Sequence, residues 1–182
     1  MKTITRSNVY LPMAAIILTV ALAIPAAAQR LVPCGPDVAP LCFNGTFQGS
    51  DDTSHEPTLI QSMTGIGTHV GRFSSTTTLT IGPSGGIGTA TWTAANGDSI
   101  STTVVGTPEA LGTAPCQVEG AQPGDLYLKV TEINIITGGT GRFAGIQGGF
   151  TVTLYHDVST PGTMHGTCGS YSGSITSPGA AD

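Results

Sequence analysis

The sequence predicts an all-β protein, an eight-stranded antiparallel β-barrel. Three features of its 182 residues favour this fold. Apolar and hydroxylated side chains alternate along most of the chain, which is the two-residue period of a half-buried strand. Runs rich in Gly, Asn and Pro separate the alternating segments, as turns do. No segment shows a helical period, and helix formers such as Lys and Glu are scarce, since charged residues make up only 9% of the chain.

The first 28 residues have the pattern of an export signal peptide. Lys2 and Arg6 precede an apolar run from Ala14 to Ala23, and Ala26–Ala28 supplies the small residues of a cleavage site. The apolar run is shorter than the roughly 20 residues of a membrane span. We therefore expect a secreted or periplasmic protein with no membrane attachment after cleavage.

Eight strands are predicted after the signal. In chain order they are Phe43–Ser50, Leu59–Met63, Arg72–Ile81, Thr89–Ala94, Ser99–Val105, Leu126–Ile136, Phe150–Asp157 and Thr163–Ile175. The turn Asn96-Gly97-Asp98 joins the fourth to the fifth, because the central positions of a tight hairpin favour Asn and Gly. The segment Pro108–Gly124 shows no alternation and is predicted to be one long loop.

The alternating region defines one β-barrel domain, residues 43–176, between an N-terminal segment, 29–42, and a flexible tail, 177–182. Consecutive antiparallel strands without a covering helix favour closure, because closure removes the exposed edges that would pair with other copies. A two-sheet β-sandwich is the alternative, since alternation alone does not separate the two.

Four cysteines, Cys34, Cys42, Cys116 and Cys168, follow the signal. An even number in an exported chain predicts disulfides. Of the three pairings, we favour Cys34–Cys42, which would clip the N-terminal segment, and Cys116–Cys168, which would tie the long loop to the last strand. A metal site is disfavoured because the chain has no CxxC pair.

The charge balance excludes one class of function. After residue 28 the chain carries four basic residues, namely Arg30, Arg72, Lys129 and Arg142, against 11 acidic ones. Binding of nucleic acid through a basic patch requires many more cations to neutralise phosphates. We expect no nucleic-acid partner, no metal and no cofactor.

A glycine-rich segment resembles a known group of proteins. Thr137-Gly138-Gly139-Thr140-Gly141-Arg142-Phe143 and then Gly148-Gly149-Phe150 resemble the corresponding segment of allene oxide cyclase barrel-like and dirigent-like proteins, closest to small secreted bacterial members of uncharacterised function. The resemblance implies an eight-stranded antiparallel barrel with a central cavity. In the enzymes of the group the cavity binds an apolar substrate and guides its cyclisation or coupling without a metal or organic cofactor. No catalytic constellation of those enzymes matches here, and the Cys34/Cys42 pair is not general in the group.

The glycine motif also has a purely structural interpretation. Gly138, Gly139 and Gly141 permit backbone angles that other residues avoid, so the strand can bend back sharply. Arg142 would project from this turn, where Glu132 or Asp157 could hold it. Phe143 would fold inward as a plug.

The best acid–base candidates are Glu132 and His156. His156 shares a strand face with Val152 and Leu154, and Glu132 shares one with Val130. If both faces line the barrel, a carboxyl and an imidazole meet in an apolar cavity, where desolvation shifts both pKa values. The alternative places His156 at the rim in water. Further candidates are Tyr155 and Tyr171 as proton donors, and Trp92, Phe150 and Tyr171 as ligand contacts.

Three functional hypotheses follow. The leading one is an exported, disulfide-stabilised barrel that binds a small apolar ligand and is not an enzyme. The second is a cofactor-free isomerase or cyclase acting on a hydrophobic substrate through Glu132 and His156. The third is a structural surface protein, favoured by the exterior rich in Thr and Gly.

Overall fold

A computed structural model describes residue 34 and residues 40–116, 118 and 121–176. The predicted signal peptide, residues 29–33 and 35–39 of the N-terminal segment, and the predicted tail lie outside the described residues.

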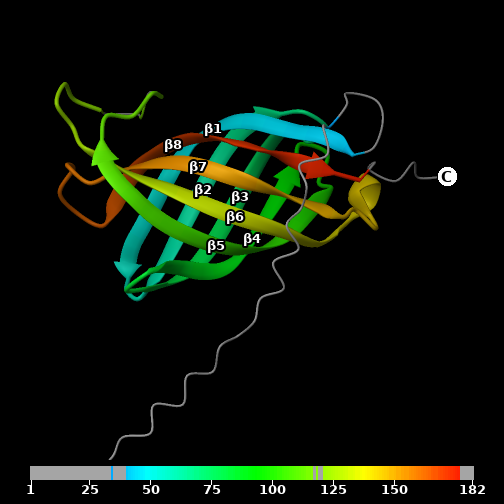
Figure 1. Ribbon diagram of the computed structural model, residues 1–182, viewed down its shortest axis with the longest axis horizontal. Helices are drawn as coiled ribbons and strands as arrows, with labels where there is room; N and C mark the ends of the chain where they lie inside the picture. Colours follow the sequence, from blue (N-terminus) through cyan, green and yellow to red (C-terminus); the bar gives the residue numbers. More distant parts are fainter. Residues whose placement is uncertain (1–33, 35–39, 117, 119–120, 177–182) are drawn as a thin grey trace, which may run out of the picture. The chain divides into compact units, whose positions relative to one another are not determined.

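Eight antiparallel strands form a closed barrel in which each strand pairs with its neighbour in sequence. They are β1 (Leu41–His55), β2 (Thr58–Gly67), β3 (Gly71–Gly82), β4 (Gly85–Ala94), β5 (Ser99–Gly112), β6 (Tyr127–Gly139), β7 (Gly148–Asp157) and β8 (Met164–Ile175). Pairing of β1 with β8, from Leu41 opposite Ile175 to Asp52 opposite Met164, closes the cylinder. Figure 1 shows these two strands side by side, β1 in cyan and β8 in red. The predicted barrel is confirmed, and the sandwich alternative is wrong.

Several strands extend beyond their predicted ends, and β1 and β5 extend furthest. β1 continues past Ser50 to His55. β5 continues to Gly112, so the prediction that the loop begins at Pro108 was wrong. The register of β5 on β6 shifts between Pro108 and Leu111. Proline has no N–H to give to a ladder, and an irregular pairing of this kind tolerates it.

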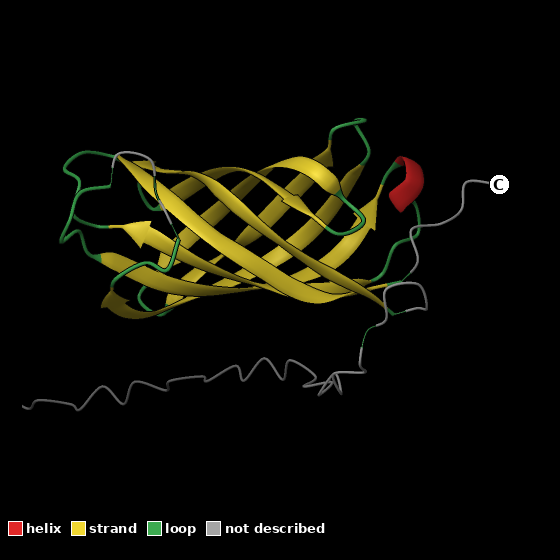
Figure 2. Ribbon diagram, turned by 90° about the horizontal axis from the view of Figure 1, so that it is seen from above, coloured by secondary structure: helices red, strands yellow, loops and turns green. Residues whose placement is uncertain are grey.

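The two ends of the barrel differ. The turns β2–β3 and β4–β5 and the short 3-10 helix η1 (Gly141–Phe143), between β6 and β7, lie at one end, here called the sealed end. Figure 2 shows η1 in red at this end. The connections β1–β2, β3–β4, β5–β6 and β7–β8 lie at the other, here called the open end, because antiparallel neighbours reverse direction at alternate ends.

An aromatic cluster fills the half of the barrel near the sealed end. Its ring centroids lie 4.9–5.8 Å apart, and its members are Phe43, Phe73, Trp92, Phe150 and Tyr171. Glycine makes room for these rings: a Cβ at Gly45 would lie 2.6 Å from the Tyr171 Cε1 atom. Phe143 and Ile146 belong to the same buried core. Large side chains therefore occupy this half completely.

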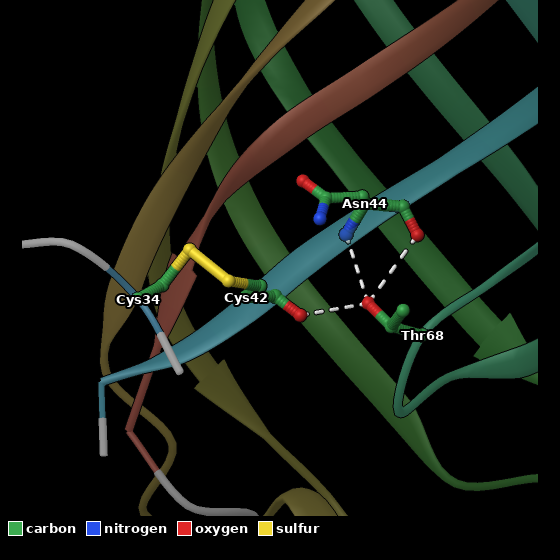
Figure 3. Close-up of a disulfide and its surroundings, with 4 residues drawn as sticks. All are labelled: Cys34, Cys42, Asn44 and Thr68. Atoms are coloured by element: carbon green, nitrogen blue, oxygen red, sulfur yellow. Dashed lines mark hydrogen bonds between the residues drawn. A yellow bond between two sulfur atoms is a disulfide. The ribbon is translucent and has the colours of Figure 1, made fainter. Parts of the chain in front are cut away.

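Both predicted disulfides are present, and no cysteine among the described residues is free. Cys34 is bonded to Cys42 at the start of β1 (Figure 3). Beside it, the Thr68 hydroxyl donates a hydrogen bond to the Cys42 carbonyl at 2.7 Å and accepts one from the Asn44 N–H at 2.9 Å. These contacts tie the β2–β3 turn to the first strand.

The second disulfide holds the β5–β6 loop against the barrel. Cys116 is bonded to Cys168 on β8, across 52 residues. Cys168 is fully buried in a small cluster with Val118 and Tyr127, separate from the main core. Tyr155 packs against this cluster. The loop therefore covers part of the outer wall of the barrel.

Candidate functional site

A cavity of about 640 Å³ occupies the half of the barrel near the open end. Its wall is mostly aliphatic, with Leu59, Leu79, Leu128, Val130 and Leu154 among the lining residues. Its mouth lies at the connections of the open end and includes Glu56, Pro57, Gly82, Gly85 and Pro108. The space is therefore a pocket with an entrance, set beside a solid core.

The polar residues that line this cavity include Asp51 on β1, Gln61 on β2, Glu132 on β6 and His156 on β7. Asp51 stands opposite Gln61 across one ladder and opposite His165 across the other. Alternation turns every second side chain of a strand inward, so residues far apart in sequence meet inside the cylinder.

Asp51 and His156 form a buried hydrogen-bonded pair. The Asp51 Oδ2 atom lies 2.5 Å from the His156 Nδ1 atom, and the side chains are 0% and 15% exposed. The His165 ring lies beside His156, with centroids 4.9 Å apart. Burial raises the pKa of Asp51, and the hydrogen bond with His156 and the charges of both imidazoles act against that rise. The pair leaves His156 Nε2 as the ring nitrogen available to a bound molecule.

Glu132 is a buried carboxyl group on the same cavity. It is 1% exposed. Burial raises its pKa to about 7, while a hydrogen bond with Gln61 lowers it and the charge of Asp51 raises it further. A carboxyl group with this pKa exists in both protonation states near neutral pH, which suits proton transfer or a response to ligand charge.

The structure places both predicted acid–base residues on the cavity, but they do not form a direct pair. Glu132 stands opposite Val152, while His156 stands opposite Leu128. The two are four residues apart along the strands by this register, which is roughly 13 Å. Asp51 is instead the partner of His156. The 15% exposure of the His156 side chain also differs from the water-exposed rim position of the alternative.

Sequence reasoning missed Asp51, because the first strand was predicted to end at Ser50. A signal was present: Asp51 has the same parity as Phe43 and Phe47, whose side chains face inward. Extending the alternation by one residue would have placed a carboxyl group inside the barrel.

The aromatic candidates lie apart from the cavity. Trp92, Phe150 and Tyr171 pack against one another in the aromatic cluster and are absent from the cavity wall. Burial raises the pKa of Tyr171, whose hydroxyl has no hydrogen-bond partner within the described part of the chain. Tyr155 lies with the cluster under the β5–β6 loop.

The glycine motif forms a turn at the sealed end, and its arginine has a different partner from the two that were predicted. Arg142 Nε lies 3.7 Å from Asp98 Oδ2, and Arg142 Nη2 donates to the Val70 carbonyl at 3.1 Å. Glu132 is inside the cavity and Asp157 accepts from Ser159 and Thr160, so neither holds Arg142. Phe143 is fully buried, as the plug prediction requires.

Within the described ranges, no group of three or more His, Cys, Asp and Glu side chains is placed to hold a metal ion. No helix in this part of the chain has the length and hydropathy of a membrane span. The two disulfides are compatible with an oxidising environment.

No family model, no curated protein and no solved structure matches this chain.

Proposed function

We propose that this protein is an exported binding module that holds a small, largely apolar ligand in the cavity of its barrel. The cavity carries the proposal: about 640 Å³ of space with an aliphatic wall and a few convergent polar groups, which is the usual character of a ligand site. The signal-like residues 1–28 and the two disulfides support export to a secreted or periplasmic location. The resemblance to allene oxide cyclase barrel-like and dirigent-like proteins supports the same role.

The uneven filling of the barrel favours ligand binding over a purely structural role. Aromatic rings fill one half, whereas the other half has an aliphatic wall around open space. Unfilled volume in a core costs stability, at roughly 24 cal/mol per Å³ of cavity. Gly86 and Gly106 widen the cavity, and a Cβ at Gly106 would meet no atom closer than 3.5 Å. A side chain would therefore fit at Gly106, and the chain has none there, whereas a Cβ at Gly86 would lie 2.9 Å from Ile81 Cδ1.

Filling the cavity tests the proposal. Val130→Trp places an indole in the cavity from β6, while the control Ile133→Trp adds the same group on the outer face of the same strand, where Ile133 is 52% exposed. We expect the wild type and Ile133→Trp to bind an uncharged solvatochromic dye such as Nile red, and Val130→Trp to bind it at least about tenfold more weakly. Fluorescence titration measures the three affinities. Equal affinities for all three proteins would contradict the proposal.

A second candidate function is a cofactor-free isomerase, and the Asp51–His156 pair favours it. A carboxyl group on Nδ1 orients an imidazole as a general base through Nε2. In a hydrophobic ketone substrate, His156 would accept a proton from the carbon beside the carbonyl, and protonated Glu132 would return a proton to the shifted double bond. Exchange with water then resets both groups, so the net reaction moves one double bond.

Conversion of a β,γ-unsaturated cyclic ketone to its conjugated isomer, followed by ultraviolet absorbance, tests this candidate. We expect turnover in the wild type and a loss of roughly 10²-fold or more in Asp51→Asn and in Glu132→Gln, because each removes one proton-transfer group or its orientation. Glu109→Gln, on the Lys129 ion pair, is the control. A rate equal to that in buffer, or turnover whose pH dependence survives Glu132→Gln, removes the enzyme hypothesis.

A further inference from the structure

Buried oxygen atoms on the cavity lack hydrogen-bond partners. Asp51 Oδ1, Gln61 Oε1 and Glu132 Oε1 have none among the described residues. The three side chains, here called the polar floor, are 0%, 2% and 1% exposed, and all three line the cavity. Leaving a buried polar atom unpaired costs about 1–3 kcal/mol. A ligand that donates hydrogen bonds to these atoms would recover that cost.

The polar floor is a set of acceptors, so it discriminates between ligand head groups. A carboxylate ligand has only acceptor atoms, and it would meet two carboxyl groups. An alcohol supplies one donor. A primary ammonium group supplies three donors and a positive charge, which equals the number of unpaired acceptors. Hydrogen bonds between charged groups are about twice as strong as neutral ones.

His156, the basic side chain described on the cavity wall, is hydrogen-bonded through Nδ1 to Asp51 Oδ2 and leaves Asp51 Oδ1 and Glu132 Oε1 without a partner. No Lys or Arg of the described residues lines the cavity. Lys129 pairs with Glu109, and Arg142 pairs with Asp98 at the sealed end. Glu56 adds a further carboxylate at the mouth. A buried pair of carboxyl groups without a basic side chain of Lys or Arg favours a positively charged guest.

We propose that the ligand is an amphiphilic amine, with its protonated amino group bound by Asp51, Gln61 and Glu132 and its apolar part against the aliphatic wall. This inference rests on the proposed function and names the class of ligand. Leu79, Val130 and Leu154 supply apolar surface for the tail. The ligand would enter at the open end. The barrel would then enclose both its apolar tail and its amino group.

Binding of such an amine is coupled to pH through Glu132. The groups that face this carboxyl are Gln61 on β2 and Asp51 on β1; His156 on β7 and His165 on β8 lie on the Asp51 side. A nearby ammonium favours the ionised carboxylate, so the amine releases a proton from Glu132 when it binds near pH 7. Affinity therefore increases as the pH rises from 6 to 8.

Calorimetric titration with three eight-carbon probes tests the inference on the full mature protein. We expect octylamine to bind about ten- to a hundredfold more tightly than 1-octanol, and octanoate to show no binding. Repeating the octylamine titration at pH 7 in two buffers of different ionisation enthalpy measures the protons released. We expect a net release, which disappears in the titration with octanol.

Glu132→Gln keeps the shape of the side chain and removes its charge. We expect this variant to lose about tenfold or more in octylamine affinity, to release fewer protons, and to lose much less in octanol affinity than in octylamine affinity. Glu109→Gln removes a carboxylate outside the cavity and should change none of these values. Octanol binding also serves as the check that the variant has folded, and the wild-type comparison of the three probes stands without the variant.

The outcomes separate the two proposals. Equal binding of octylamine and octanol, or preferred binding of octanoate, overturns the amine inference and leaves the cavity as an apolar ligand site. Octylamine binding that is unaffected by Glu132→Gln also overturns it. Absence of binding by all three probes and by the uncharged dye contradicts the proposed function itself.

Discussion

Glu132 is a carboxyl group that the fold buries at a cost in stability. Its pKa is about 7 in the folded protein and 4.5 in an unfolded chain. Between these two values the folded state holds a proton that the unfolded state has lost. The unfolding free energy therefore falls as the pH rises from about 4.5 to about 7, and the full penalty is present above pH 7. Its size is on the order of 3 kcal/mol.

Glu132→Gln should remove this penalty. Gln resembles the protonated side chain, so the variant and the wild type are expected to have similar stability at pH 4.5, and the variant to be about 3 kcal/mol more stable at pH 8. Urea denaturation at the two pH values measures the difference. Glu109→Gln, at an exposed ion pair, should give no gain at pH 8. A variant that is less stable than the wild type at pH 8 would show that the buried carboxylate is compensated.

The residues of the site were only partly predictable. Alternation identified Glu132 and His156 as inward-facing, because every second side chain along a strand points to the same face of the sheet. The partner of His156 depends on which strand closes the cylinder, and only the β1–β8 pairing brings Asp51 near β7 and β8. The partner of Arg142 likewise depends on a contact between two turns, and sequence spacing carries no information on that.

At the scale of elements, the turn between β6 and β7 depends on one glycine in particular. Gly141 has a φ of +55°, and a Cβ there would lie 1.8 Å from Asp98 Oδ1. The Arg142 N–H donates to Asp98 Oδ2 at 3.3 Å. The same carboxylate therefore holds the turn and excludes a side chain at Gly141. Gly138, three residues earlier, has open space around it.

Gly141→Ala should destabilise the barrel by about 1–3 kcal/mol, because it places alanine in the left-handed region and displaces Asp98. Gly138→Ala is the matched control and should stay within about 0.5 kcal/mol of the wild type, since no atom lies within 4 Å of its added Cβ. Thermal unfolding followed by circular dichroism measures both. Equal effects of the two substitutions would mean that the positive φ and the Asp98 contact do not govern this turn.

Sequence patterning predicted the strands well and their ends less well. All eight were located, because alternation of bulky and hydroxylated residues marks at least part of each strand. β5 continues past its predicted end because Pro108 lies where the register of the β5–β6 ladder shifts. At such a position a proline does not mark the end of a strand. β1 ran past Ser50 because two aspartates resemble a loop, although Asp51 pairs on both sides.

For the whole molecule, the Cys116–Cys168 disulfide closes by far the longer loop of the two. It spans 52 residues, against 8 for Cys34–Cys42. By loop-closure entropy, replacing both members of a pair with Ala should cost about 4 kcal/mol for Cys116 and Cys168, and about 2.5 kcal/mol for Cys34 and Cys42. Urea denaturation of the two double variants gives the order. If the Cys34/Cys42 variant were the less stable of the two, the length of the closed loop would not determine how much each disulfide stabilises the protein.

The aromatic cluster lies in the half of the barrel near the sealed end, and the cavity of the proposed ligand site lies in the half near the open end. Leu79 and Leu154 line the cavity and belong to the same hydrophobic cluster as Trp92, and Val130 packs against that cluster. Under the proposed function, substitutions in the cavity wall would alter which ligand binds while the aromatic rings near the sealed end stay in place. A barrel built in this way could change the ligand that the proposed function assigns to it and keep the aromatic core that stabilises its fold.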